Sequence, residues 1–291
     1  MAGLWANLIG VTLVAWTLRE IFIDLFQPSG AGDLSSLVGR QLFRVARRFP
    51  LMMPVAGPLS IVVVISSWPM LLAVGFALIY WPYFPQAFVG SAVNPQSTLG
   101  KFWSVLYFSL ASLTTLAASG ITPRGSWISV VSALESLIGT SLITASVTWI
   151  VLIYPALGRM RALARRASIL LKAQEQTKID VVSDDVEHLL GDLANGVIRT
   201  RVDFIHFPLI YYFHAGTDKA SLAKSLIQLQ RFADSAVADE RPERVRLSAA
   251  VLKIALAEIA ELLAKKFVRK ADPRNPATVF HAMAKEHLED K

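Results

Sequence analysis

The most constraining feature of the sequence is a long segment without charge, because no Asp, Glu, Lys or Arg occurs between Arg48 and Lys101. Within it, residues 57–83 are apolar and long enough to cross a membrane, whose hydrocarbon core takes roughly 20 helical residues. A second apolar run covers 127–154, with Glu135 as its single charge. The two runs predict transmembrane helices and exclude a uniformly soluble protein.

Charged residues are distributed unevenly along the chain. Of the 29 Lys and Arg residues 22 lie in 159–291, as do 18 of the 22 Asp and Glu residues. The first part is therefore suited to lipid and the second to water. The net charge of +7 divides almost evenly between the two parts, which gives no argument for a nucleic-acid partner.

No pattern in the sequence predicts an enzyme, a cofactor or a metal site. The chain has no cysteine, which excludes disulfides, thiolate metal sites and a thiol nucleophile. The H-E-x-x-H, P-loop and G-x-S-x-G patterns are also absent. The aromatic segment 205–214 contains two of the five histidines, and a packed segment kinked at Pro208 is favoured over a metal or pH-sensing site.

Arginines that flank the apolar runs predict the orientation, because Lys and Arg accumulate on the cytoplasmic side of a membrane. They are Arg40, Arg44, Arg47 and Arg48 before the first run, and Arg159, Arg161, Arg165 and Arg166 after the second. The shorter apolar run 4–18 is interpreted as a transmembrane helix within 1–26, with an interfacial anchor as the alternative. We therefore expect three spans, an N-terminus outside and cytoplasmic segments 27–54 and 156–291. The membrane would be the plasma membrane, or the inner membrane of a Gram-negative bacterium.

Residues 37–49 have the pattern of a basic amphipathic helix within the loop 27–54. The apolar side consists of Leu37, Val38, Leu42, Val45 and Phe49, and four arginines occupy the other side. Such a helix is suited to the inner surface of the membrane. An ordinary basic loop with helical periodicity by chance is the alternative.

Residues 102–115 are apolar but only 14 residues long, which is too short to cross the membrane. With positions 83 and 126 both outside, this segment has to enter the membrane and return. Irregular backbone at membrane depth is tolerated where protein or water covers it, as in a selectivity filter. The sequence therefore predicts a re-entrant helix and loop between the two spans.

The re-entrant segment reads Tyr107-Phe-Ser-Leu-Ala-Ser-Leu-Thr-Thr-Leu-Ala-Ala-Ser-Gly-Ile-Thr-Pro123. It resembles the pore loop of tetrameric potassium channels, which usually has T-T-V-G-Y-G-D-I-T-P in the last ten places. The run Ala133-Leu-Glu-Ser-Leu-Ile-Gly139 likewise resembles the start of their inner helix. The resemblance covers about residues 55–155 and implies an all-α membrane protein whose pore domain has an outer helix, a pore helix with a filter-like loop, and an inner helix.

The filter-like loop departs from the pattern of that family. Thr114 and Thr115 keep the two threonines, whereas the other aligned positions are Leu116 for valine, Ala117 and Ser119 for the two glycines, Ala118 for tyrosine and Gly120 for aspartate. In that family, backbone carbonyls of the loop replace the hydration shell of the ion. The positive φ angles involved cost a residue with a Cβ about 1–2 kcal/mol. The resemblance with these changes implies poor potassium selectivity, through either a wider opening lined by hydroxyls or a collapsed loop.

Further candidate site residues lie on or near the inner helix. Ser132, Ser136, Thr140, Thr144 and Thr148 recur every fourth residue and form a hydroxyl face, which can line water or bond to its own helix. The resemblance makes Gly139 a hinge candidate, with close helix packing as the alternative, and makes Glu135 a brace that bonds to the loop backbone. Arg124 falls at the expected outer mouth, where four copies would lower the local cation concentration. A solvated loop position is the alternative for Arg124.

The charge-rich part is predicted to be all-α. After an extension of the inner helix through 159–176, helices are expected at 184–196, 199–213, 219–239, 242–270 and 276–289. Thr217 or Asp218, and Asn275, are candidate N-caps, and Pro242 and Pro276 fit first turns. The apolar face within 247–263 predicts burial against neighbouring helices or other copies of the chain.

The leading hypothesis is a homotetrameric ion channel of the potassium-channel type with a non-standard filter, gated through its cytoplasmic helical domain. Its partners would be other copies of the chain, membrane lipids and permeating ions. One alternative is a non-conducting scaffold or sensor with a channel-like fold, whose helical domain binds a partner or ligand. Another is a membrane-anchored module in which that helical domain alone carries the function.

Overall fold

The computed structural model describes residues 2–27, 32–90, 98–116, 120–178, 187–214, 221–237, 241–269 and 271–287. In these parts the chain is all-α, as predicted, apart from one pair of two-residue strands. It divides into two compact units. The membrane unit comprises Met1–Ser35 and Ile61–Val151, and the helical unit comprises Ser36–Ser60 and Leu152–Lys291.

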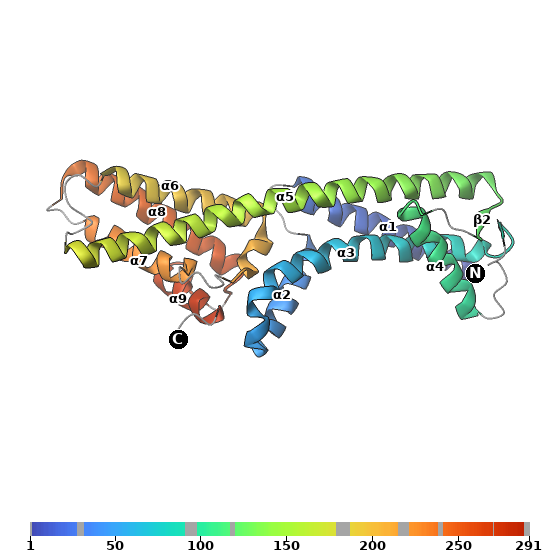
Figure 1. Cartoon of the computed structure of the whole chain (residues 1–291), viewed down its shortest axis with the longest axis horizontal. Coiled ribbons are helices and arrows are strands. Elements are labelled where there is room, and N and C mark those ends of the chain that lie inside the picture. Colours follow the sequence, from blue (N-terminus) through green and yellow to red (C-terminus); the bar gives the residue numbers. More distant parts are fainter. Residues whose placement is uncertain are drawn as a thin grey trace. The chain divides into compact units, whose positions relative to one another are not determined.

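Long helices make up most of the membrane unit (Figure 1). They are α1 (Ala2–Phe26), the greater part of α3 (Met53–Tyr80), α4 (Thr98–Leu113) and the first half of α5 (Ser126–Thr177), with a short helical turn η2 (Trp81–Tyr83) after α3. α1 extends past the predicted run 4–18 because the charged side chain of Glu20 finds hydrogen-bond and ion-pair partners nearby. Glu20 is fully buried, accepts a hydrogen bond from the backbone N–H of Leu34 at 3.0 Å and pairs with Arg19 at 3.3 Å.

α1 approaches α3 closely through two glycines. A Cβ on Gly10 would lie 2.6 Å from the carbonyl oxygen of Gly75, and a Cβ on Gly75 would lie 2.7 Å from Val14. Any larger residue would push the two helices apart. Small residues at such contacts are typical of helix pairs in membranes. Nearer the start of α1, the side-chain amide of Asn7 donates a hydrogen bond to the hydroxyl of Tyr83 at 3.0 Å.

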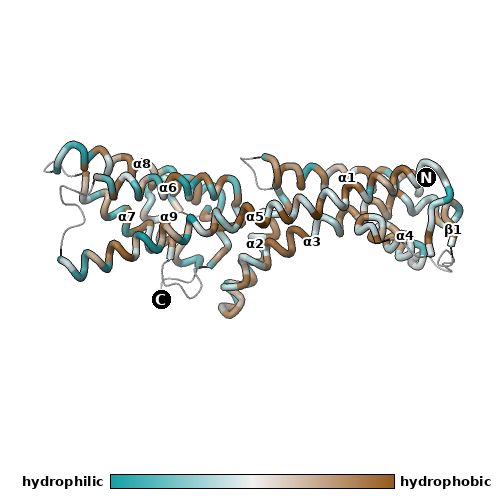
Figure 2. Tube along the Cα trace, turned by 45° about the horizontal axis from the view of Figure 1, so that its top comes forward, coloured by the Kyte–Doolittle hydropathy of each residue, from teal (hydrophilic) through white to brown (hydrophobic). Residues whose placement is uncertain are grey.

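Within the described residues, two helical segments are long and apolar enough to cross a membrane, Met53–Tyr83 and Ser126–Thr177. They contain the predicted spans 57–83 and 127–154. Only 44% and 28% of their most apolar windows are buried within the chain, so lipid or another protein has to cover the remainder. Hydrophobic colouring also continues along α1 in Figure 2, although α1 does not meet the same criterion.

The helical unit packs around α8 (Glu243–Lys266). The neighbours of α8 are α6 (Glu187–His206), α7 (Leu222–Ala236) and α9 (Pro276–Glu286), and η3 (Pro208–Tyr212) follows α6. Leu252 and Ile259 are fully buried in this core, whereas Leu247 and Ile254 are 68% and 61% exposed. The predicted apolar face of α8 is therefore only partly covered by its own chain.

The sequence analysis predicted two helices where the structure has the single helix α6, and this prediction was wrong. The prediction separates 184–196 from 199–213, whereas α6 continues from Glu187 to His206. Gly196 does not end the helix because it serves close packing. A Cβ at this position would lie 2.9 Å from Cδ1 of Leu163 on α5.

The helix starts in this unit agree only in part with the predicted caps. α7 is capped by Ser221, whose hydroxyl accepts from the backbone N–H of Lys224 at 3.2 Å, while Thr217 and Asp218 lie outside the described residues. Pro242 occupies the N-cap of α8 rather than its first turn. Asn275 caps α9 as predicted, with its side chain 3.4 Å from the backbone nitrogen of Thr278.

The amphipathic segment forms α2 (Asp33–Arg48), followed by the short turn η1 (Pro50–Met52). Within the helical unit, α2 packs on an aromatic cluster from η3 and α9. The ring of Phe43 lies 5.4 Å from Tyr212 and 4.9 Å from His287, and a Cβ on Gly39 would collide with Tyr212. The side of α2 that contacts protein therefore lies between the arginines and the apolar side predicted to face lipid. On that apolar side, Val45 remains 48% exposed.

Candidate functional site

The segment between α3 and α5 begins and ends at the same place in the membrane unit. Strand β1 (Phe88–Val89) precedes α4, and β2 (Thr122–Pro123) follows the loop after it. The strands pair antiparallel, with Phe88 opposite Pro123, and the backbone N–H of Arg124 donates to the carbonyl of Ala87 at 2.8 Å. The two ends of the α4 segment are thereby fixed together. The sequence analysis did not predict this strand pair, because two residues are too few for a periodic pattern.

The filter-like loop is described only at its edges. Thr114, Thr115 and Leu116 are exposed at the end of α4, and Gly120 is half-buried where the chain enters β2. Ala117, Ala118 and Ser119 lie outside the described residues. Thr115 has a φ of +53°, a left-handed conformation that is unusual for a β-branched residue. The side chain of Arg124 is exposed next to β2.

Glu135 connects the three helices around this loop. It lies on α5, is fully buried, and accepts hydrogen bonds from the hydroxyl of Tyr80 on α3 at 2.8 Å and from the hydroxyl of Ser109 on α4. The expected bond from Glu135 to the loop backbone stays a prediction, because residues 117–119 of the loop lie outside the described residues. Within the described residues, Glu135 therefore joins α5 to α3 and α4.

An aromatic cluster surrounds the Glu135 contacts. The ring of Tyr80 lies 5.4 Å from Phe108 on α4 and 6.3 Å from Phe88 on β1, and the latter two rings lie 5.2 Å apart. All three rings are buried, and they come from three different elements, α3, β1 and α4. Sequence reasoning missed this cluster because its members share no local periodicity. The sequence did offer one indication: a single carboxylate in an apolar run, Glu135, requires buried hydrogen-bond donors nearby.

Gly139 lies directly against the end of α4. A Cβ at Gly139 would be 1.9 Å from the carbonyl oxygen of Leu113 and 2.7 Å from its carbonyl carbon. Helix α5 runs without interruption from Ser126 to Thr177 and includes this position. The close contact favours the packing interpretation of Gly139 over that of a hinge.

The five residues of the hydroxyl face have two different environments. The hydroxyl of Ser132 lies 3.1 Å from that of Ser112, and the hydroxyl of Ser136 lies 2.8 Å from the carbonyl oxygen of Ser112, so both meet the end of α4. The remaining three, Thr140, Thr144 and Thr148, are exposed, and each donates to the carbonyl four residues earlier at 3.0, 3.2 and 3.0 Å. The hydroxyl face thus begins as a contact with α4 and continues as a free surface of this chain.

The helical unit holds no group of three or more His, Asp or Glu side chains placed to bind a metal, as far as the structure describes it. The aromatic segment predicted around Pro208 forms η3, and Leu209, Ile210, Tyr211 and Tyr212 are all buried. Burial lowers the pKa of His287 from 6.5 to about 3, with smaller contributions from His214 and Arg47. Burial also raises the pKa of Tyr211, whose hydroxyl donates to Glu286 at 2.7 Å. Tyr211, Tyr212 and His287 form a packed cluster around Phe43 of α2.

Comparison with known proteins gives one informative match. No known protein family matches the sequence, and no solved structure matches it significantly. The chain is 25% identical over 214 residues to the "Uncharacterized membrane protein YdjJ" of Bacillus subtilis (strain 168), an alignment that covers 70% of this chain and 61% of that protein. The chain thus spans less than two thirds of the length of that relative. This similarity agrees with the two apolar helices and indicates a membrane protein.

Proposed function

We propose that the chain is one subunit of a homotetrameric ion channel whose pore domain resembles that of potassium channels but carries a non-standard filter. Its N-terminus would lie outside the cell, α1 would add a third span, and the helical unit would lie in the cytoplasm. The resemblance of residues 107–123 and 133–139 to the pore loop and inner helix motivates this assignment.

The observation that carries the proposal is the geometry of the α4 segment. The 16-residue helix α4 is too short to span, and the segment that contains it begins and ends at one strand pair. Hydrogen bonds from Ser109 to Ala73 and from Ser136 to Ser112 hold α4 against both long helices. The buried bonds from Tyr80 and Ser109 to Glu135 fix its position between α3 and α5. A rigid support of this kind is what a re-entrant pore helix requires.

Tetramer formation is supported by the large uncovered surface of α5. The exposed hydroxyls of Thr140, Thr144 and Thr148 would face a shared central path. Neighbouring apolar side chains such as Leu137 and Ile143, which are 63% and 59% exposed, would contact other subunits or lipid. In the helical unit, the exposed Leu247 and Ile254 would be covered in the same assembly.

The proposal also includes an altered ion selectivity and gating by the cytoplasmic helical unit. With Ala117 and Ser119 in place of the two filter glycines, the carbonyl geometry that selects potassium is costly, so a path lined by hydroxyls would pass several ions. α5 is a single helix from the predicted mouth to the helical unit, where Arg159 bonds to Asp203 through two nitrogens at 2.9 and 2.7 Å. A movement of the helical unit would therefore act directly on the inner helix.

Ion flux through liposomes tests the conducting form of this proposal. The purified full chain should release trapped potassium, sodium or chloride, and the Ala117→Gly plus Ser119→Gly variant should shift the preference toward potassium. No flux of any of these ions, over a range of pH and voltage, would refute conduction.

One observation favours a second candidate, a non-conducting scaffold or sensor with the same fold. The hydroxyls of Thr114, Thr140, Thr144 and Thr148 all bond to backbone carbonyls of their own helices and leave no O–H directed at a permeating ion. In that case the glycine double variant would leave liposomes as impermeable as the wild-type chain does.

A further inference from the structure

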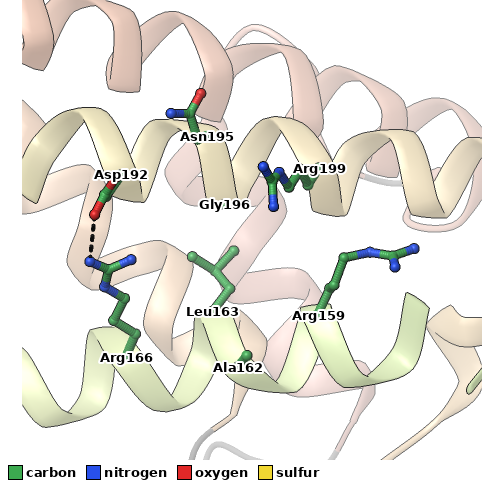
Figure 3. A pocket seen from close by; sticks show the side chains of 8 residues that line it. All are labelled: Arg159, Ala162, Leu163, Arg166, Asp192, Asn195, Gly196 and Arg199. Atoms are coloured by element: carbon green, nitrogen blue, oxygen red, sulfur yellow. Dashed lines mark hydrogen bonds and ion pairs between the residues drawn. The ribbon is translucent and has the colours of Figure 1, made fainter. Parts of the chain in front are cut away.

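A basic pocket of about 280 Å³ lies between the last third of α5 and α6 in the helical unit (Figure 3). Arg159 and Arg166 enter it from α5, and Arg199 enters it from α6. Asp192 is the single carboxylate among the lining residues. The lining therefore carries more positive than negative charge, which favours an anionic ligand.

The three arginines differ in their availability. Arg159 is held by Asp203, whose side chain is 6% exposed, and Arg166 is paired with Asp192 at 2.8 Å. Arg199 lines the pocket and makes no hydrogen bond or ion pair with any residue that the structure describes, and in Figure 3 its guanidinium lies against α6 beside Gly196. Since a guanidinium carries five N–H donors, Arg166 and Arg159 also keep donors beyond those in their ion pairs.

Small residues leave the space open. Ala162 and Gly196 stand between the charged positions on the two helices, and Leu163 forms a buried floor that is 4% exposed. A larger side chain at Gly196 would press on Leu163. The pocket thus combines a dry floor with guanidinium groups from two sides, and its volume is at the small end of ligand sites, which are roughly 300–1,000 Å³.

We propose that this pocket binds the phosphate group of an anionic ligand. The forked guanidinium matches phosphate oxygens in pairs, and donors that come from two helices suit a tetrahedral oxyanion better than a flat carboxylate. A soluble phosphate compound or the headgroup of an anionic phospholipid supplies the same chemistry. The second source is credible because Arg159 follows the end of the predicted span by only five residues. The ligand would bridge α5 and α6, a role independent of whether the chain conducts.

The test uses the full chain in nanodiscs of phosphatidylcholine at constant ionic strength. In one arm inorganic phosphate is titrated and binding is followed by calorimetry. In the other, phosphatidate replaces part of the neutral lipid and the melting temperature is measured. The Arg199→Gln variant should weaken the effect about tenfold or more, as expected for loss of a charge-assisted bond. Ala162→Leu, which fills the pocket without changing charge, should act similarly.

The matched control is Arg231→Gln, which removes an exposed arginine of α7 outside the pocket. A response to phosphate that depends on Arg199 but not Arg231 supports a soluble ligand, and the same dependence in the phosphatidate arm alone supports a lipid. Equal behaviour of wild-type, Arg199→Gln and Arg231→Gln proteins in both arms would overturn the proposal. Binding is read directly, so this result does not depend on ion flux.

Discussion

Replacing Gly139 with alanine would place a methyl group 1.9 Å from the carbonyl oxygen of Leu113. This oxygen belongs to the backbone at the end of α4, which cannot move aside as a flexible side chain would. Overpacking of this kind costs about 1–3 kcal/mol, and the backbone contact argues for the upper end. Alanine regains about 1 kcal/mol of helix propensity over glycine. The expected net loss is therefore about 2 kcal/mol of unfolding free energy.

Gly158 provides a matched control on the same helix. Nothing lies within 4 Å of a Cβ at this position, so Gly158→Ala should gain the propensity of about 1 kcal/mol. Thermal unfolding in detergent, followed through the paired Trp68 and Trp149, should shift in opposite directions for the two variants, by about 2–4 °C per kcal/mol. If Gly139 were a flexible hinge without close packing, both variants would be stabilised alike, and that result would refute the packing argument.

Three further predictions concern charged and titratable groups. Glu135→Leu should lower stability by about 1–3 kcal/mol because it leaves the buried hydroxyl of Tyr80 without its acceptor, while Ser109 keeps the carbonyl oxygen of Ala73 at 3.0 Å. Glu135→Gln should cost clearly less, and equal melting temperatures for the two variants would contradict this role. The pKa of His287 is about 3 in the folded chain and 6.5 when unfolded, so its neutral form stabilises the fold above pH 6.5 and this stability is lost as the pH falls below that value, by up to about 1.4 kcal/mol per pH unit. His287→Phe should flatten the decline of melting temperature between pH 7 and pH 5, and an unchanged slope would argue against it. Arg124→Gln should raise cation conductance at low salt in bilayer recordings, while Lys172→Gln, an equal charge change on the far part of α5, should not.

The helices were predictable wherever a long apolar or amphipathic period was present. The runs 57–83 and 127–154 correspond to α3 and α5, and the extension of the inner helix through Pro155 is present as one continuous helix to Thr177. Periodicity alone failed at Gly196, where a residue that often ends helices instead permits a close contact with Leu163. That contact joins residues 33 positions apart on two different helices, so no local pattern reveals it.

The candidate sites show the same division between local and non-local information. Glu135 stood out because a lone carboxylate in an apolar run requires partners, yet its partners Tyr80 and Ser109 are polar groups without distinguishing spacing. The basic pocket could not be predicted, because Arg159 and Arg166 belong to an arginine-rich segment that the accumulation of Lys and Arg on the cytoplasmic side already explained. Only the antiparallel approach of α5 and α6 separates Arg199, which lacks a partner in the described residues, from the arginines held in ion pairs.

Single-channel recording with ion substitution tests the central claim most directly. The full chain in a planar bilayer should give discrete openings whose reversal potential shifts little when sodium replaces potassium, because the filter glycines are absent. A silent bilayer under all ions tested, or openings strictly selective for potassium, would contradict the account.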